Sequence, residues 1–359
     1  MSKKTRYFMA GSAAIIVAGL CTGLVAYYGG GFPSLSASRS GPPELSYVPA
    51  DATVVAFANV RDIMNSQVRQ KLKAALPNET GQQEFQKETG IDIEHDIQYV
   101  VAAMTTPGAG GMNNPNGLVV ARGTFNTTQL EQLARDHGGV VEDYKGKRLI
   151  KVSDPNNASH TLDLAFLESG LVGIGSETAI KSSIDAQLSA QSISSNSDIM
   201  ELVSQIDNGN NAWAVGRFDV IASQAKLPTE ISSKLPAVKT FAVMTHIDGG
   251  VSGTLRAEAR DQQSADNLRQ VVQGALALGR MSNDPKATAL INSFQVSGTG
   301  TTVALSFTVP MELFDMIPNG IKSGDMGQHL HELPRELHEL KVPDAPRPPK
   351  APRPPVPER

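Results

Sequence analysis

The residues best able to do chemistry in this chain are carboxylates grouped around His95. Asp92, Glu94 and Asp96 surround that imidazole within one short stretch, and oxygen-rich groups of this kind bind hard cations. A calcium loop of the EF-hand type needs a fixed twelve-residue spacing, which is absent here. A solvated turn ahead of a strand explains the stretch better, so we expect no metal and no cofactor.

Motifs for nucleophilic or phosphate chemistry are missing from the sequence. The serine-rich run 182–197 contains no G-x-S-x-G elbow, and the glycine-rich run 107–117 lacks the Lys of a phosphate-binding loop. We therefore expect a binding or scaffold protein of unknown ligand and no catalysis. The alternative is a hydrolase with an unrecognised site between two repeats, where a deep pocket would gather several of Asp92, His95, His137, His160 and His246.

Residues 319–342 contain a candidate partner contact. Although Pro334 would interrupt a continuous helix, leucines at spacings of three and four form an apolar seam in an amphipathic segment: Leu330, Leu333, Leu337 and Leu340. His331 and His338 lie beside this seam, but a spacing of seven residues separates them by about 10 Å along a helix, too far for one metal ion. The segment is therefore expected to pack on the folded domain or on a partner.

Residues 343–359 are rich in proline and predict a disordered tail. Proline lacks the amide donor of regular structure, and the stretch offers few apolar side chains to offset the entropy of ordering. Arg347 and Arg353 belong to a repeated A-P-R-P-P unit and give the tail a cationic face. Such a face suits contact with an envelope protein or an anionic envelope polymer.

Residues 8–28 predict a single transmembrane helix. They contain no charged side chain and are long enough to cross a bilayer at about 1.5 Å per residue. Basic side chains in residues 1–7 place that end in the cytoplasm and the bulk of the chain outside. A linker rich in Gly, Ser and Pro follows at 29–46. The alternatives are a cleaved signal peptide and lipidation at Cys21.

The composition excludes several classes of protein. The net charge of −4 gives no electrostatic footprint for nucleic acid. Cys21 is the one cysteine, so the expected outer domain has no disulfide and no thiolate metal ligand. Hydrophobic residues make up 40% of the chain and aromatic residues only 5%, which favours a folded core built from aliphatic side chains.

After the linker, the sequence predicts an α+β fold of two tandem repeats. The order strand–helix–strand–strand–helix–strand is expected in residues 47–190 and again in 208–318, with a linker at 191–207. Asp62 and Asp219 each open a helix after a short apolar strand. Strands in adjacent pairs between helices favour antiparallel or mixed sheets. One larger mixed domain is the alternative, and a sheet shared by both halves fits the same pattern.

Two stretches resemble a loose group of uncharacterised bacterial signal-anchored envelope proteins. They are VPADATVVAFANV, where Pro49-Ala50-Asp51 turns into a strand, and GIDIEHDIQYV. With the basic N-terminus, the apolar segment and the linker, the resemblance covers about residues 1–105. It implies a periplasmic or otherwise extracytoplasmic domain held at the bacterial cell membrane, and it supplies no activity.

Overall fold

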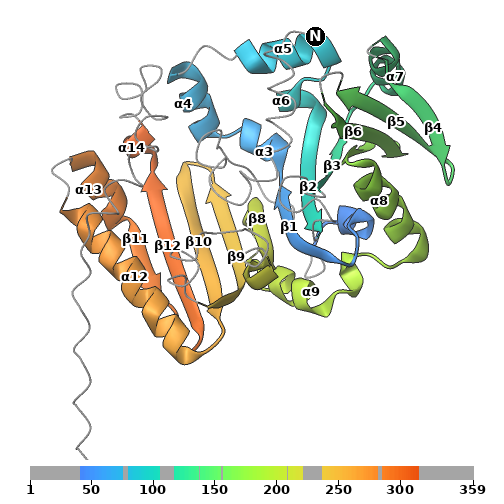
Figure 1. Cartoon of the computed structure of the whole chain (residues 1–359). Coiled ribbons are helices and arrows are strands. Elements are labelled where there is room, and N and C mark those ends of the chain that lie inside the picture. Colours follow the sequence, from blue (N-terminus) through green and yellow to red (C-terminus); the bar gives the residue numbers. More distant parts are fainter. Residues whose placement is uncertain are drawn as a thin grey trace, which may run out of the picture. The chain divides into compact units, whose positions relative to one another are not determined.

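The computed structural model describes residues 41–75, 80–105, 117–136, 138–154, 157–207, 209–220, 237–281 and 285–314 (Figure 1). All of them belong to one compact unit that ends at Asp315.

A single antiparallel sheet of twelve strands is the framework of this unit (Figure 1). The strand order is β11-β12-β10-β9-β8-β1-β2-β3-β7-β6-β5-β4. The strands are β1 Ala52–Ala58, β2 Ile97–Thr105, β3 Gly117–Gly123, β4 Val140–Tyr144, β5 Lys147–Asp154, β6 Asn157–Glu168, β7 Leu171–Gly175, β8 Ala212–Arg217, β9 Val238–Ile247, β10 Gly250–Ala259, β11 Phe294–Ser297 and β12 Thr302–Pro310.

Short helices connect and cover these strands. They are η1 Pro43–Tyr47, α3 Val60–Met64, α4 Gln67–Ala75, α5 Thr80–Thr89, α6 Ile93–Asp96, α7 Thr127–Asp136, α8 Glu177–Ser189, η3 Ile193–Ser195, α9 Ser197–Ser204, α12 Gln262–Arg280, α13 Pro285–Asn292 and α14 Met311–Phe314.

The strands β1 and β8 lie at the centre of the sheet because both are apolar on both faces. Val55 of β1 pairs with Val215 of β8 on one side and with Ala103 of β2 on the other. Neighbouring Ala56, on the opposite face, is also buried. Alternation sends successive side chains to opposite faces, so a continuous apolar run fits a strand covered on both sides.

Read outward from this centre, the two halves follow the same strand order. The first half runs β1-β2-β3-β7-β6 and the second half runs β8-β9-β10-β12-β11. The first half then adds β5 and β4, which form a hairpin at its outer edge. Each half therefore places three sequential strands beside one another and then returns through a helix to the strands beyond them.

The expected α+β architecture of two tandem repeats, each with the order strand–helix–strand–strand–helix–strand, is wrong. One continuous antiparallel sheet crosses both halves, and the halves contribute seven and five strands. An open edge strand leaves a row of backbone N–H and C=O groups unpaired. Pairing β1 with β8 removes one such edge from each half and buries two apolar strands, which explains the single sheet.

No helix among the described residues is long and apolar enough to cross a membrane. The expected span 8–28, the linker to residue 40, the amphipathic segment 319–342 and the tail 343–359 lie outside the described residues.

Helix α8 covers one face of the first half. Its N-cap is Ser176, whose hydroxyl accepts from the Ala179 amide at 3.1 Å. Ile180 and Ile184 of this helix are fully buried in a cluster with side chains of β2, β3, β5 and β6: Val101, Ala103, Leu118, Val120, Leu149 and Ala165. Because these strand residues share one face of the sheet, α8 fixes which face carries the main core.

Helix α12 covers the opposite face, over the second half (Figure 1). The Asp261 carboxylate caps it by accepting from the Ser264 amide at 2.8 Å. Ala265 and Leu268 of α12 then pack on Val303 of β12. The two halves are thus covered by their long helices on different faces.

Candidate functional site

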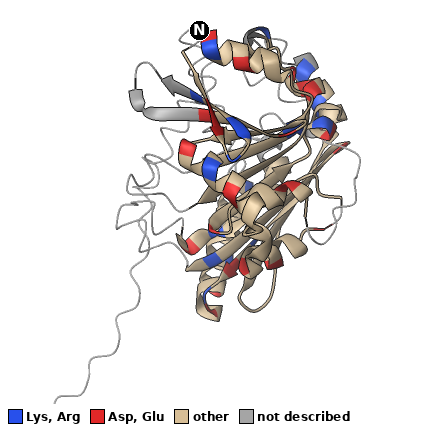
Figure 2. Ribbon diagram, turned by 90° about the vertical axis from the view of Figure 1, so that its right-hand side faces the viewer, with Lys and Arg blue, Asp and Glu red and all other residues tan. Residues whose placement is uncertain are grey.

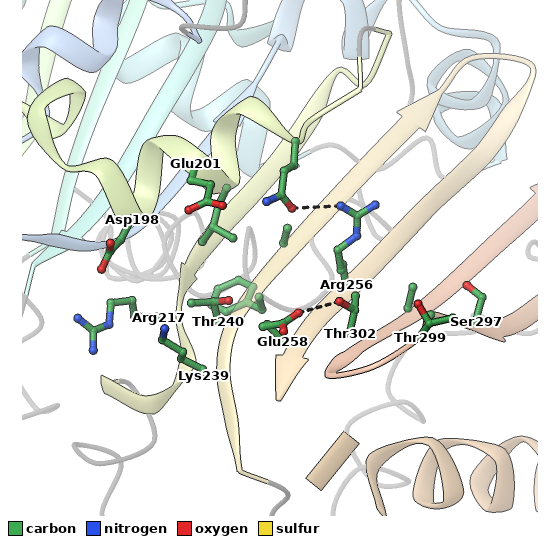
Figure 3. Close-up of a pocket in the computed structure, with 16 residues that line it drawn as sticks. Asp198, Glu201, Arg217, Lys239, Thr240, Arg256, Glu258, Ser297, Thr299 and Thr302 are labelled. Carbon is green, nitrogen blue, oxygen red and sulfur yellow. Dashed lines mark hydrogen bonds between the residues drawn. The ribbon is translucent and has the colours of Figure 1, made fainter. Parts of the chain in front are cut away.

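A polar groove of about 630 Å³ lies on the second half of the sheet (Figure 3). Its walls are helix α9, the strands β8, β9, β10 and β12, and the turn between β11 and β12. Alternation along β12 places Thr302 on the side opposite Val303, which faces α12. The groove therefore opens on the sheet face that α8 covers in the first half.

The strands make this face polar. On β10 it carries Thr254, Arg256 and Glu258, and the paired positions of β12 carry Ser306, Ala304 and Thr302. The hydroxyls of Thr254 and Ser306 lie 3.0 Å apart. A sheet face that must pack against a helix is apolar, as it is under α8. The polar residues here indicate a face made for contact with water or with a ligand.

Helix α9 forms the wall nearest the core. Asn196 caps it through a bond from the Ile199 amide at 3.2 Å. Ile199 and Val203 are buried in the main core, which turns the other side of the helix outward. Asp198 and Glu201 lie on that outer side and line the groove (Figure 3).

A hydrogen bond joins the two walls. Arg256 on β10 donates from Nη1 to the Gln205 Oε1 at the end of α9, over 3.2 Å (Figure 3). The bond is charge-assisted, and its acceptor is a neutral amide. The guanidinium is therefore oriented across the groove without being neutralised.

Glu258 is held on the floor of the groove by two hydroxyls. Thr302 donates from Oγ1 to Glu258 Oε2 at 2.8 Å, and Thr301 donates to Oε1. Both donors lie at the beginning of β12, opposite the end of β10. Both of these donors are neutral hydroxyls, and no described cation forms an ion pair with this carboxylate.

Two cations border the groove at its other end. Arg217 of β8 forms a bidentate pair with Asp219, with Nη2–Oδ2 at 3.0 Å and Nε–Oδ1 at 3.3 Å. The hydrogen bond that Arg217 donates to Asp219 raises the pKa of Arg217 and lowers the pKa of Asp219. Lys239, at the start of β9, is exposed and forms no ion pair with any described residue.

The lining residues that the structure describes include hydroxyls, acids and bases but no His and no Cys. A weak nucleophile such as a serine hydroxyl needs an adjacent general base. Ser297 and Thr299 lie at the turn between β11 and β12, away from the carboxylate of Glu258 (Figure 3). The arrangement is suited to holding a polar ligand.

The histidine cluster singled out in the sequence lies elsewhere. Asp92 is the N-cap of α6, accepting from the Glu94 amide at 2.9 Å, and its Oδ2 lies 2.8 Å from His95 Nδ1. Burial raises the pKa of Asp92, but the hydrogen bonds from His95 and Glu94 outweigh it and lower the pKa. Glu94 itself binds Arg69 at 2.6 Å. These charges neutralise one another around a helix start.

Of the other candidate histidines, His246 is the one whose side chain the structure describes, and it lies outside the groove. His246 lies near the end of β9, with Nδ1 2.6 Å from the Gly209 carbonyl oxygen, whereas the groove uses the beginning of that strand. His137 lies outside the described residues, and only the backbone of His160 is described, within β6. Within the described part of the chain, no group of His, Cys, Asp or Glu is placed to hold a metal.

The expected partner-contact residues are not placed by the structure. Leu330, Leu333, Leu337, Leu340, Arg347 and Arg353 all lie outside the described residues. The groove residues, by contrast, were not anticipated from the sequence. The available signal was the alternating run Thr254 to Glu258, whose polar side chains recur every second residue on β10.

Buried charges also occur beneath η1. The Glu44 carboxylate is buried, with 2% of its surface exposed, and accepts from Arg122 Nε. Arg122 also approaches Glu168, which accepts from the Tyr47 hydroxyl at 2.6 Å. Burial, followed by that hydrogen bond, raises the pKa of Tyr47. This network ties η1 to the ends of β3 and β6.

Charges of both signs are interspersed over the described elements (Figure 2). Lys and Arg occur beside Asp and Glu on most helices in that view. Such a surface gives no extended cationic stripe, in keeping with the net charge of −4.

Comparison of this chain with protein-family models, with curated proteins and with solved structures finds no match. Its function is therefore inferred from the fold and the groove.

Proposed function

We propose that this chain is a membrane-anchored extracytoplasmic binding protein without catalytic activity, and that the groove beside α9 holds its ligand. The observation that carries the proposal is the contrast between the two halves of one sheet face. The first half of that face is packed against α8. The second half carries Arg256, Glu258 and Thr302 in an open groove.

The side chains of the groove are organised in advance of any ligand. Gln205 orients Arg256, two threonine hydroxyls hold Glu258, and Asp219 fixes Arg217. Ordering a charged side chain when a ligand binds costs about 0.5–1.5 kcal/mol. Groups that are already held avoid most of this cost, which favours recognition over a merely solvated surface.

The membrane location rests on the sequence. The apolar segment 8–28 and the basic residues before it support an anchor with its N-terminus in the cytoplasm. The resemblance of residues 1–105 to envelope proteins supports an extracytoplasmic domain. A reporter fused after Leu330 should be active only if it is of the kind that folds outside the cytoplasm, and activity of a cytoplasm-only reporter there would rule out this topology.

The groove is tested by site-directed crosslinking. Cys21 is the one natural cysteine, so Cys21→Ser gives a background in which a single new thiol carries a photoactivatable maleimide. Thr299→Cys places the probe in the groove, and Val271→Cys places it on an exposed position of α12 as the control.

Irradiation of cells that express each variant should give discrete adducts from position 299 and none from position 271. Equal adducts from both positions, or none from position 299, would show that the groove does not hold a ligand.

A further inference from the structure

The charges of the groove are divided between its walls. Asp198 and Glu201 lie one helical turn apart on α9, and neither carboxylate forms an ion pair with another residue that the structure describes. Both side chains are exposed. This wall therefore presents two exposed anionic groups, and the charge of Asp198 also contributes to the raised pKa of Arg217.

The sheet side presents the cations. Lys239 is exposed at the start of β9, and Arg256 is bonded within the described residues to the neutral amide of Gln205. Arg217 differs from them, because the carboxylate of Asp219 neutralises it. Glu258 lies between Lys239 and the turn (Figure 3). A ligand across the groove meets carboxylates on one side and cations with one further carboxylate on the other.

This distribution excludes ligands of a single charge sign. A nucleic acid or another polyanion would lie against Asp198, Glu201 and Glu258, where repulsion offsets the attraction of the cations. A neutral ligand would cover charged groups without pairing them, and a desolvated, unpaired charge is strongly unfavourable. A ligand that carries both charges within a short length satisfies both walls.

We propose that the groove binds a short peptide segment that carries acidic and basic side chains close together. The inference rests on the proposed binding function and adds the class of ligand. The peptide amides match the hydroxyl donors and acceptors of Thr240, Ser297 and Thr299 on the floor and turn. The volume of about 630 Å³ suits a segment of a few residues.

The test measures binding of fluorescent peptides of equal length to the purified full-length protein in detergent. The probes are a peptide of alternating lysine and glutamate, one of lysine and serine, one of glutamate and serine, and one of serine and glycine. We expect the mixed-charge peptide to bind roughly tenfold more tightly than each of the others, a difference of about 1.4 kcal/mol.

Variants show whether the groove is responsible. Glu201→Gln and Lys239→Gln each remove one charge from an exposed position, so both proteins should keep the wild-type melting temperature. Each should weaken binding of the mixed-charge peptide roughly fivefold. Arg135→Gln, on the exposed side of α7, is the matched control and should leave binding unchanged.

The outcomes distinguish an error in the proposed ligand class from an error in the proposed binding site. Tighter binding of a single-sign peptide, with the same sensitivity to Glu201→Gln or Lys239→Gln, would overturn the mixed-charge class and leave the groove as a binding site. Absence of binding by every peptide would also overturn the class. Binding that neither variant changes would contradict the groove itself.

Discussion

Arg256 and Gln205 connect a strand and a helix that are far apart in the sequence, through a hydrogen bond of 3.2 Å. The bond links β10 to the end of α9, and both of its residues line the groove. It leaves the charge of Arg256 without a carboxylate partner among the described residues, and this combination of fixed position and free charge is what a recognition site needs.

Gln205→Ala should affect binding more than stability. The side chain is exposed, and a hydrogen bond at such a position contributes at most about 1 kcal/mol to the free energy of unfolding. Loss of the acceptor frees Arg256 to move, so affinity for the mixed-charge peptide should fall roughly threefold to tenfold. Chemical denaturation and fluorescence anisotropy of the same preparation measure both quantities. A large loss of stability without a loss of affinity would contradict the positioning role.

Asp163 on β6 should make the stability of the domain depend on pH. Its carboxylate is fully buried, and neither oxygen has a hydrogen-bond partner among the described residues. Burial, and then the nearby charge of Glu177, raise its pKa from 3.8 to about 6, against the opposing effects of Lys151 and Lys181. The carboxylate of Glu142 raises it as well.

The direction in which stability changes with pH follows from proton uptake on folding. Because the pKa of Asp163 is higher in the folded state, folding binds protons between about pH 4 and pH 6. The contribution of Asp163 to the free energy of unfolding is therefore most favourable below that range. It becomes less favourable as the pH rises through the range. Asp163→Asn should remove the effect and raise the melting temperature at about pH 7.5, where the charged form costs about 3 kcal/mol.

Calorimetry at about pH 4.5 and about pH 7.5 checks this prediction. The difference between wild type and Asp163→Asn should be larger at the higher pH. Asp248→Asn, at an exposed turn, is the control and should keep the wild-type dependence. If Asp163→Asn were equally destabilised at both pH values, the carboxyl group of Asp163 would contribute only through packing.

Arg122→Met should destabilise the domain strongly. The substitution leaves the buried Glu44 without its cation, and breaking a buried ion pair on one side costs about 3–5 kcal/mol. Arg135→Met removes a cation of similar size from an exposed pair with Glu131 and should leave the denaturation midpoint unchanged within error. Urea denaturation of both variants decides the matter. Equal midpoints would show that the pair of Arg122 with Glu44 does not stabilise the domain.

Glycine substitutions test the centre of the sheet. A Cβ at Gly216 would lie 2.8 Å from the Thr53 carbonyl oxygen and 3.0 Å from the Phe241 ring. Gly216→Ala should therefore destabilise by about 1–3 kcal/mol, because β8 and β1 must separate slightly. Gly274 of α12 has open space around its Cβ direction, so Gly274→Ala should stabilise by about 0.5–1 kcal/mol. Thermal melting of both variants gives the comparison, and a neutral Gly216→Ala would argue against the pairing of β1 with β8.

Local signals in the sequence predicted several elements well. The apolar runs 96–104 and 118–125 predict strands, and the structure has these strands as β2 and β3, with ends that differ by a residue or two. Asn126 precedes a run with helical periodicity, which predicts that it caps a helix, and its side chain accepts from the Gln129 amide at 3.1 Å. Asp62 was expected to do the same, but Asn59 is the N-cap there, because β1 ends at Ala58.

Long-range pairing could not be predicted from local patterns. The apolar runs of β1 and β8 are compatible with a position at the centre of a sheet. Neither run contains a local signal that predicts pairing with the other strand. The segment 191–207, expected as a linker, contains η3 and α9, with Ile193, Ile199 and Val203 buried. The groove combines α9 with strands that follow it by as many as about a hundred residues, so its members become neighbours only through the sheet.

Hydrogen–deuterium exchange of the full-length protein, with and without the mixed-charge peptide, tests the central claim most directly. Local opening exposes backbone amides, and a bound ligand slows their exchange where it lies. We predict slower exchange in α9, residues Ser197–Ser204, and in the turn 297–301, with α12 unchanged as an internal control. Protection confined to other elements, or no protection at a peptide concentration that saturates binding, would contradict a ligand site in this groove.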